Sequence, residues 1–233
     1  MEKRLTTRMR RAVVVVVVVA LCLAALLAGC GGNGGAPSAT NVETTAAGAG
    51  IPAGFTVRAV KDEGFSIALP KKWRSLDAQE ALSSGSLKSF EKANPQLADQ
   101  IQALAQPNSP LKLLAIGPAG NGFVTNLNVI VTGIPSNLGF DEWTSAEVAE
   151  IQKVPAVKDI KQQKTQLQPG QALHLGYRAS FNRSGGSFEV FVHQWMLKDE
   201  GFLYILTFTT SPAQEPKQRK TFDASAHTFR LTP

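Results

Sequence analysis

The chain contains two neighbouring segments near its C-terminal end that are apolar on both faces of a strand. Between Phe202 and Thr209, large side chains at every second position alternate with Leu203 and Ile205. Residues 188–197 show the same pattern, and the short turn 198–201 joins the two segments. Adjacent antiparallel strands that are apolar on both faces need cover from both sides. The chain must therefore place further layers on both faces of an antiparallel sheet.

The other periodic segments supply candidate layers. Leu173, Leu175 and Tyr177 alternate with His174 and Arg178, which predicts a strand that is polar on one face. In the same way, the sequence predicts strands over residues 55–60, 65–69, 111–116 and 124–132, and helices over 94–104, 139–153 and from about residue 215. The expected fold class is α+β: an α/β/α sandwich with an antiparallel sheet covered by helices on both faces.

The N-terminus has the three parts of an export signal. Five basic residues precede a wholly apolar stretch over residues 12–28, and the run Leu27, Ala28, Gly29, Cys30 ends it. This run resembles the lipobox of bacterial lipoproteins, which predicts a signal peptide over residues 1–29, cleavage between Gly29 and Cys30, and a lipid on the Cys30 thiol. An uncleaved membrane anchor is the alternative, because an apolar stretch of this length reaches the lower limit for spanning. Met1 and Met9 are both candidate starts.

Removal of the signal peptide changes the apparent charge of the protein. The whole chain carries 24 Lys and Arg against 18 Asp and Glu, and residues 1–29 hold five of the basic residues and one acidic residue. The remainder has 19 against 17, so net charge does not support nucleic-acid binding. Cys22 lies in the signal and Cys30 is the lipidation site, which leaves no thiol for catalysis, disulfides or metal ligation.

Downstream of the cleavage site the composition divides the chain into two parts. Residues 30–54 are rich in Gly, Ala, Thr and Ser with a single charge at Glu43, which predicts a flexible tether behind the lipidated cysteine. Residues 55–233 have the length of one domain and show no internal repeat. We therefore expect one globular domain held away from the membrane surface.

Local phrases in this domain resemble the PsbP-like superfamily, which includes thylakoid PsbP proteins and a yeast Ran-binding protein. The phrases are GFSIALPKKW at residues 64–73, NLNVIV at 126–131, PGQA at 169–172 and AHTFRL at 226–231. The chain thus resembles a bacterial, actinobacterial-type lipoprotein with a PsbP-like domain. The resemblance implies an α/β/α sandwich, no catalytic residues and a role in binding or assembly, and it implies no particular site.

Motifs for catalysis, cofactors and metals are missing from the sequence. It contains neither a Gly-x-Ser-x-Gly elbow nor a phosphate-binding loop, and its three histidines have no metal-ligand spacing. We expect His174 to be solvated or lightly packed on the polar face of its strand. His193 is expected to be a hydrogen-bonded core residue. The sequence therefore predicts no enzyme, no cofactor site and no metal site.

Three groups of charged residues are expected to have structural rather than functional roles. Residues 71–74 (KKWR) could contact anionic lipids or wall polymers, but we expect Trp73 to fill the core while the lysines are solvated. Asp141 and Glu142 suit the start of a helix, where carboxylates are stabilised by the dipole. The cations at 217, 219 and 220 are expected to be the solvated face of the last helix.

These observations predict a lipid-anchored, non-catalytic binding or assembly module on the extracytoplasmic face of the cell membrane. Its expected contacts are the membrane, through the lipid on Cys30, and an envelope protein, but no nucleic acid. The alternative is a carrier or sensor of a small apolar ligand such as a lipid, held between the sheet and the helices. A hydrolase of unfamiliar design is the third hypothesis, and it needs titratable side chains that converge in a cleft.

Overall fold

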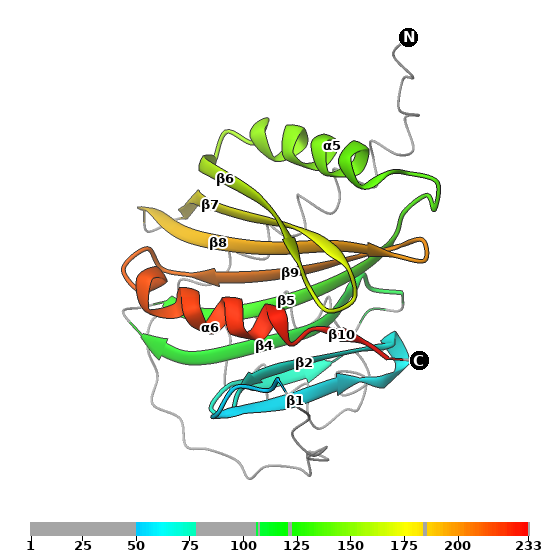
Figure 1. The fold of residues 1–233 in the computed structure, drawn as a ribbon. Coiled ribbons are helices and arrows are strands. Elements are labelled where there is room, and N and C mark those ends of the chain that lie inside the picture. Colours follow the sequence, from blue (N-terminus) through cyan, green and yellow to red (C-terminus); the bar gives the residue numbers. More distant parts are fainter. Residues whose placement is uncertain (1–49, 78–105, 107, 121–122, 184–185, 233) are drawn as a thin grey trace.

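The computed structural model describes residues 50–77, 106, 108–120, 123–183 and 186–232. Predictions on the signal peptide, Gly29 and Cys30, most of the tether and the helix at 94–104 lie outside these residues. In the described part, no helix is long and apolar enough to cross a membrane. Ten strands and two α-helices are described (Figure 1).

The larger sheet has seven antiparallel strands in the order β3-β4-β5-β9-β8-β7-β6 (Figure 1). The strands are β3 (Arg74–Asp77), β4 (Leu111–Gly120), β5 (Phe123–Gly133), β6 (Val157–Gln166), β7 (Gln171–Arg183), β8 (Gly186–Asp199) and β9 (Phe202–Thr210). The doubly apolar pair β8 and β9 lies inside this sheet, each strand with a neighbour on either side. The predicted pairing of two adjacent doubly apolar strands and the α+β class are confirmed.

Alternate side chains of β9 enter two different hydrophobic clusters. Leu203 and Ile205 belong to a cluster that includes residues of helix α5 (Phe140–Gln152). Leu206 and Phe208 belong to a second cluster that includes residues of helix α6 (Glu215–His227). Since successive side chains of a strand point to opposite faces, the two clusters form on opposite sides of the sheet.

A second, three-stranded sheet shares the face of α6. It consists of β1 (Phe55–Val60), β2 (Phe65–Pro70) and the short β10 (Arg230–Leu231), joined in part by a 3-10 turn, η1 (Lys61–Glu63) (Figure 1). Phe65 and Ile67 of β2 are fully buried in the cluster of α6. Helices therefore supply only part of the cover on this face, and the finer expectation of an α/β/α sandwich stays a prediction.

Thr228 connects the end of α6 to the small sheet. Its hydroxyl accepts a hydrogen bond from the Ala68 backbone N–H at 2.8 Å and donates one to the Ser225 carbonyl at 2.6 Å. The Thr228 hydroxyl thus both donates and accepts a hydrogen bond at this buried junction. It helps to set the position of α6 along the sheet.

Strand β6 was not expected, and its sequence explains why. Most of its side chains are exposed, and Lys158, Lys161 and Lys164 lie among glutamines without a period of two. It is an edge strand, and a bulge between Lys158 and Lys161 interrupts its pairing with β7. Lysines and bulges on an edge strand hinder its pairing with other chains. Because these exposed positions are polar, β6 lacks the apolar alternation that indicates a strand.

The interpretation of Trp73 as a core residue is confirmed. Its ring packs edge-on against Phe208 and Phe222 with centroids 6.5 Å apart. Asp141 and Glu142 lie in the first turn of α5 as expected, although neither makes a capping hydrogen bond. Asp141 pairs instead with Lys164 of β6 at 2.5 Å.

Candidate functional site

The strand register brings two histidines of β7 and β8 to one face of the sheet. Lys161, Gly176 and His193 form one row across β6, β7 and β8, and Gln163, His174 and Trp195 form the next row. Because Gly176 has no side chain, the first row is hollow at its centre. A Cβ atom there would only touch the rings of Phe191 and His193, at 3.7 and 3.8 Å.

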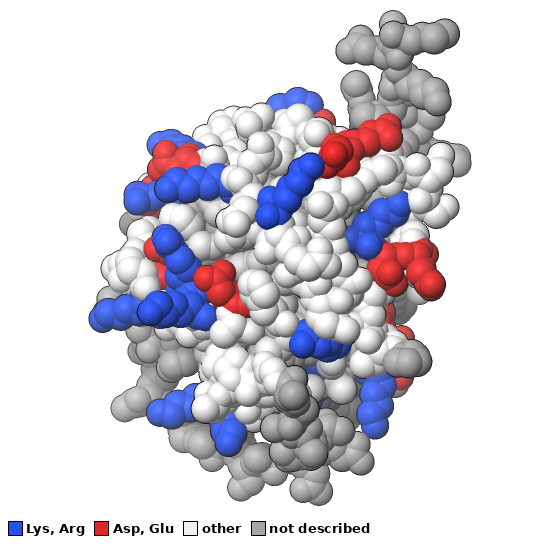
Figure 2. Space-filling view, in the orientation of Figure 1, with Lys and Arg blue, Asp and Glu red and all other residues white. Residues whose placement is uncertain are grey.

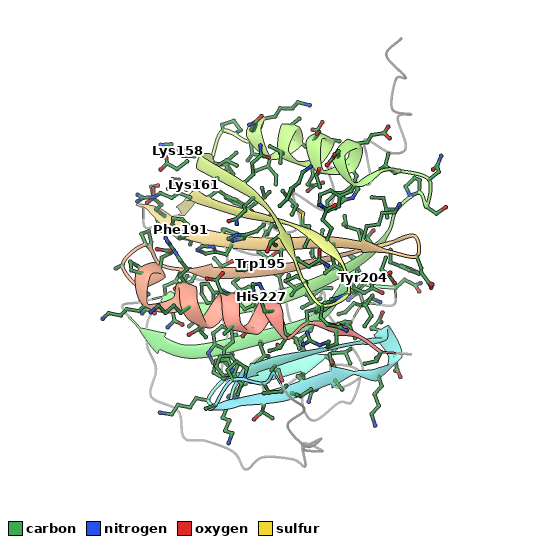
Figure 3. The ribbon with its side chains drawn as sticks, viewed as in Figure 1. Lys158, Lys161, Phe191, Trp195, Tyr204 and His227 are labelled. Atoms are coloured by element: carbon green, nitrogen blue, oxygen red, sulfur yellow. The ribbon has the colours of Figure 1, made fainter. Side chains whose placement is uncertain are left out.

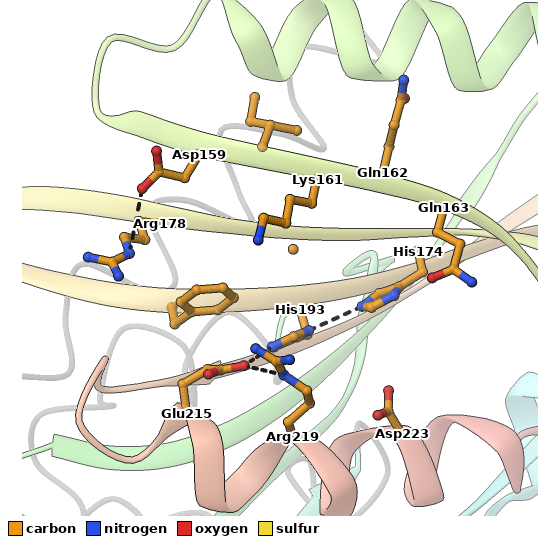
Figure 4. A pocket seen from close by; sticks show the side chains of 13 residues that line it. Asp159, Lys161, Gln162, Gln163, His174, Arg178, His193, Glu215, Arg219 and Asp223 are labelled. Atoms are coloured by element: carbon orange, nitrogen blue, oxygen red, sulfur yellow. Dashed lines mark hydrogen bonds and ion pairs between the residues drawn. The ribbon is translucent and has the colours of Figure 1, made fainter.

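This hollow is the floor of a cavity of about 800 Å³, called here the histidine pocket. Helix α6 forms one wall with Glu215, Arg219 and Asp223, which share a face because they are four residues apart. The sheet supplies the remaining lining residues: Asp159, Ile160, Lys161, Gln162, Gln163, His174, Gly176, Arg178, Phe191 and His193. Figure 4 shows Lys161 directed into the space between β6 and the two histidines. The pocket is thus the part of the sheet face that α6 leaves uncovered.

A chain of hydrogen bonds, called here the histidine relay, runs through the pocket (Figure 4). The His174 Nε2 and His193 Nδ1 atoms are 3.1 Å apart, and His193 Nε2 lies 3.0 Å from Glu215 Oε1. Arg219 donates from Nε to the same Glu215 oxygen at 2.7 Å. Three elements, β7, β8 and α6, therefore hold four side chains in one connected arrangement.

The centre of the relay is buried and its end is open. The side chains of His193 and Glu215 are 5% and 6% exposed, whereas that of Arg219 is 57% exposed. Burial by itself would raise the pKa of Glu215, but the hydrogen bonds from Arg219 and His193 outweigh it and lower the pKa. A buried carboxylate is tolerated only when it is paired in this way.

Both histidines of the relay are neutral at pH 7. Burial lowers the pKa of His174 to about 4, with smaller contributions from His193, Arg219 and His227. Burial also lowers the pKa of His193, although its bond to Glu215 opposes the change. An ionised Glu215 accepts from His193 Nε2, so we assign the His174 proton to Nε2, which donates to His193 Nδ1. The remaining acceptor, His174 Nδ1, takes no other hydrogen bond from described residues.

Aromatic rings of β8 stack on both histidines of the relay. The His174 ring stacks on Trp195 at 4.2 Å between centroids and 7° between planes, and His193 stacks on Phe191 at 5.0 Å. Figure 3 shows Phe191 and Trp195 along β8, on the side of α6. Trp195 is buried, whereas Phe191 is partly exposed at the pocket. The pocket therefore offers a ring surface beside its polar groups.

The charges around the pocket are balanced. It is lined by three carboxylates and three basic side chains, and Figure 2 shows both signs intermingled on this face. Arg178 contacts Asp159 at 3.6 Å and Glu189 at 3.2 Å. Within the described residues, Lys161 forms no ion pair. With two neutral histidines, the formal charge of the lining is close to zero.

Titratable side chains converge in the pocket, as the hydrolase hypothesis requires, but His174 is a weak base. A general base works best when its pKa is close to the working pH, and a pKa of about 4 makes His174 a weak base. The described lining contains no serine, threonine or cysteine that the relay could activate. Among the described residues, no group of three or more His, Cys, Asp and Glu is placed to hold a metal ion.

The structure corrects one expectation for this region. His174 is stacked and hydrogen-bonded instead of solvated or lightly packed, and it contacts His193 of the neighbouring strand. Arg219 lies on the exposed face of α6, as expected, and it also bonds to buried Glu215. The interpretation of His193 as a bonded core residue is confirmed, and His227 is exposed on α6.

One signal in the sequence could have revealed the histidine pair. The hairpin pairing of β7 with β8, in which Arg183 faces Gly186, places Gly176 opposite His193 and His174 opposite Trp195. Both histidines then lie on one face, in adjacent rows. No such local signal exists for Glu215, because its position depends on how α6 packs on the sheet.

The titration of His174 tests the relay. In the full-length protein, we expect the NMR signal of the His174 ring to titrate with a midpoint near pH 4, because burial and its cationic neighbours disfavour the charged ring. Glu215→Gln should displace the His193 signal most, since it removes the charge that His193 contacts. A His174 midpoint near the ordinary value of 6.5 would contradict the relay.

The chain matches no model of a known protein family, and no curated protein is significantly similar to it in sequence. Solved structures of similar fold include CyanoP, the PsbP protein of Synechocystis sp. PCC 6803, at 13% identity and a TM-score of 0.48, covering 80% of this chain and 98% of that one. LpqN of Mycobacterium tuberculosis, involved in cell envelope biogenesis, shares 12% identity at a TM-score of 0.45, covering 79% and 88%. The Ran-binding protein Mog1p of Saccharomyces cerevisiae shares 7% identity at 0.46, covering 76% and 95%. The likeness is confined to the fold.

Proposed function

We propose that this protein is a lipid-anchored, non-catalytic binding module of the cell envelope, and that it binds a polar ligand or a polar group of its partner in the histidine pocket. The histidine relay beneath the open pocket is the observation that carries the proposal. The anchor is the lipid on Cys30, and the extracytoplasmic location follows from the signal ending at Gly29. The domain would then sample envelope partners at the end of its tether.

The cost of the relay supports a role in binding. Burying the Glu215 carboxylate beside a histidine adds little to stability compared with apolar packing at the same position. What the relay provides is orientation, because two strands and a helix fix the rings of His174 and His193 before any ligand arrives. Groups held rigidly in advance reduce the entropy lost on binding.

The polar lining favours this proposal over the carrier of an apolar ligand. An apolar ligand needs a pocket lined mainly by apolar side chains, whereas most side chains lining the histidine pocket are charged or can donate and accept hydrogen bonds. The apolar side chains of the described sheet faces are instead packed into the two clusters. A lipid held between sheet and helices therefore has less support than a polar ligand.

Crosslinking from the pocket tests the proposal. A photo-crosslinking residue in place of Gln163, which lines the pocket, should form adducts in the native cell, whereas one at Gln152, exposed at the end of α5, should not. Gly176→Leu places an apolar side chain on the pocket floor, where a Cβ atom makes only ordinary contacts, so it should reduce the Gln163 adducts about tenfold. Equal adducts from both positions, or adducts that Gly176→Leu leaves unchanged, would refute a binding role for the pocket.

The anchor has its own test. Radiolabelled fatty acid should enter the wild-type protein and should be absent from Cys30→Ala, because the thiol is the expected attachment point. The mutant should also leave the membrane fraction, while Cys22→Ala, inside the signal peptide, should not change labelling. Label in Cys30→Ala would end the lipoprotein interpretation.

A further inference from the structure

We infer that the ligand of the histidine pocket is a neutral carbohydrate, bound through its hydroxyl groups against the ring of Phe191. This inference rests on the proposed function and adds the chemical class of the ligand. It follows from three properties of the lining: its charge, its donors and acceptors, and its ring surface.

The balance of charge excludes selection for a strongly charged ligand. Three carboxylates oppose three basic side chains, and both histidines are neutral. A site that selects an anion presents an excess of Arg and Lys, and a site that selects a cation presents an excess of carboxylates. Here most charges are already paired: Arg219 with Glu215, and Arg178 with Asp159 and Glu189.

The same side chains offer donors and acceptors close together. Gln163 has both on one amide, Arg219 keeps its two terminal nitrogens beyond the Nε that bonds Glu215, and Lys161 adds an ammonium. Asp223 and His174 Nδ1 add acceptors. A hydroxyl group donates one hydrogen bond and accepts others, so a ligand with many hydroxyls matches this mixture better than a carboxylate or an ammonium does.

The ring of Phe191 supplies a second element of recognition. It is partly exposed at the pocket and is fixed by stacking on His193 at 5.0 Å. The C–H face of a pyranose ring packs on an aromatic face while its hydroxyls point sideways to polar groups. The hollow above Gly176 lies beside this ring, because a Cβ atom at position 176 would lie 3.7 Å from Phe191 Cε1. A volume of about 800 Å³ accommodates a disaccharide.

Histidine NMR on the full lipidated chain tests the inference, in micelles of a zwitterionic detergent without sugar headgroups. The probes are the neutral disaccharides maltose, cellobiose and lactose, together with inorganic phosphate, acetate and a neutral dipeptide, all at millimolar concentration. We expect at least one disaccharide to shift the His174 and His193 ring signals saturably and to leave exposed His227 unchanged. Phosphate, acetate and the dipeptide should have no saturable effect.

Variants separate ring stacking from general effects on the fold. Phe191→Leu keeps an apolar side chain but removes the ring, so it should weaken disaccharide binding about tenfold. Phe202→Leu is the matched control, because Phe202 is 49% exposed and outside the pocket lining, and it should bind as the wild type does.

The outcomes distinguish the inference from the proposed function. Saturable shifts from phosphate, acetate or the dipeptide alone would overturn the carbohydrate ligand and leave a polar binding pocket. Disaccharide binding that Phe191→Leu does not weaken would overturn the stacking arrangement. The absence of any shift at His174 and His193 with every probe would overturn both the inference and the binding role of the pocket.

Discussion

Glu147→Gln is expected to make the protein markedly more stable in alkaline solution. Glu147 of α5 is 4% exposed, and burial, followed by the nearby charge of Glu150, raises its pKa to about 8. The ordinary value is 4.5, so the side chain is protonated in the folded protein at neutral pH and ionised in the unfolded chain. Folding therefore takes up a proton, and this contribution to stability is complete below about pH 4.5 and is lost as pH rises towards 8.

The size of this effect follows from the shift. A rise from 4.5 to about 8 corresponds to roughly 4–5 kcal/mol between the two protonation states. Glutamine is close in shape to the protonated acid and does not titrate. Urea unfolding should therefore show the two proteins within about 1 kcal/mol at about pH 5, and Glu147→Gln more stable by about 3–5 kcal/mol at about pH 9.

Glu150→Gln is the matched control on the same helix. Glu150 pairs with Lys153 at 2.6 Å at the surface, and its loss should cost at most about 1 kcal/mol. Because burial is the larger cause of the shift at Glu147, most of the pH dependence should remain in this control. A stability difference between Glu147→Gln and wild type that is the same at both pH values would show that Glu147 is not a buried acid.

Phe222→Ala is expected to cause the other large effect, a loss of about 3–5 kcal/mol of unfolding free energy. Phe222 is fully buried beneath α6, and its ring stacks on Phe208 with centroids 4.9 Å apart and lies against Trp73 at 6.5 Å. Truncation to alanine removes these contacts and leaves a cavity between the helix and the sheet. Urea or thermal unfolding measures the loss.

This substitution should also disturb the histidine pocket. Phe222 follows Arg219 by one turn and lies 5.9 Å from the His193 ring, so it holds the helix that carries Glu215. We expect the His193 NMR signal to move in Phe222→Ala and to stay in place in Lys220→Ala, an exposed neighbour whose effect on stability should be within about 0.5 kcal/mol. A loss below about 1 kcal/mol in Phe222→Ala would contradict the described packing of α6.

The predictions from sequence succeeded where a local pattern carries the information. The alternation from Leu173 to Tyr177 predicted that these side chains share one face, and they lie in one cluster. The helix predicted over 139–153 differs from the observed helix by one residue at each end, and the last helix begins at residue 215 as predicted. Edge strand β6 was not predicted because most of its side chains are exposed, which removes the apolar period of two. The sequence did not predict that β1, β2 and β10 form a separate sheet, because a hairpin pattern does not indicate which other strands the hairpin will pair with.

The candidate site shows the same division. The sequence by itself determined that His193 lies in a doubly buried strand and that Glu215 and Arg219 lie four residues apart on one helix, since both follow from backbone periodicity. Only the tertiary structure decided that these residues meet. The contact of His174 with His193 depends on the β7–β8 register, and that of His193 with Glu215 depends on how α6 packs across the sheet. Such contacts are set by the packing of distant apolar side chains, which no short stretch of sequence encodes.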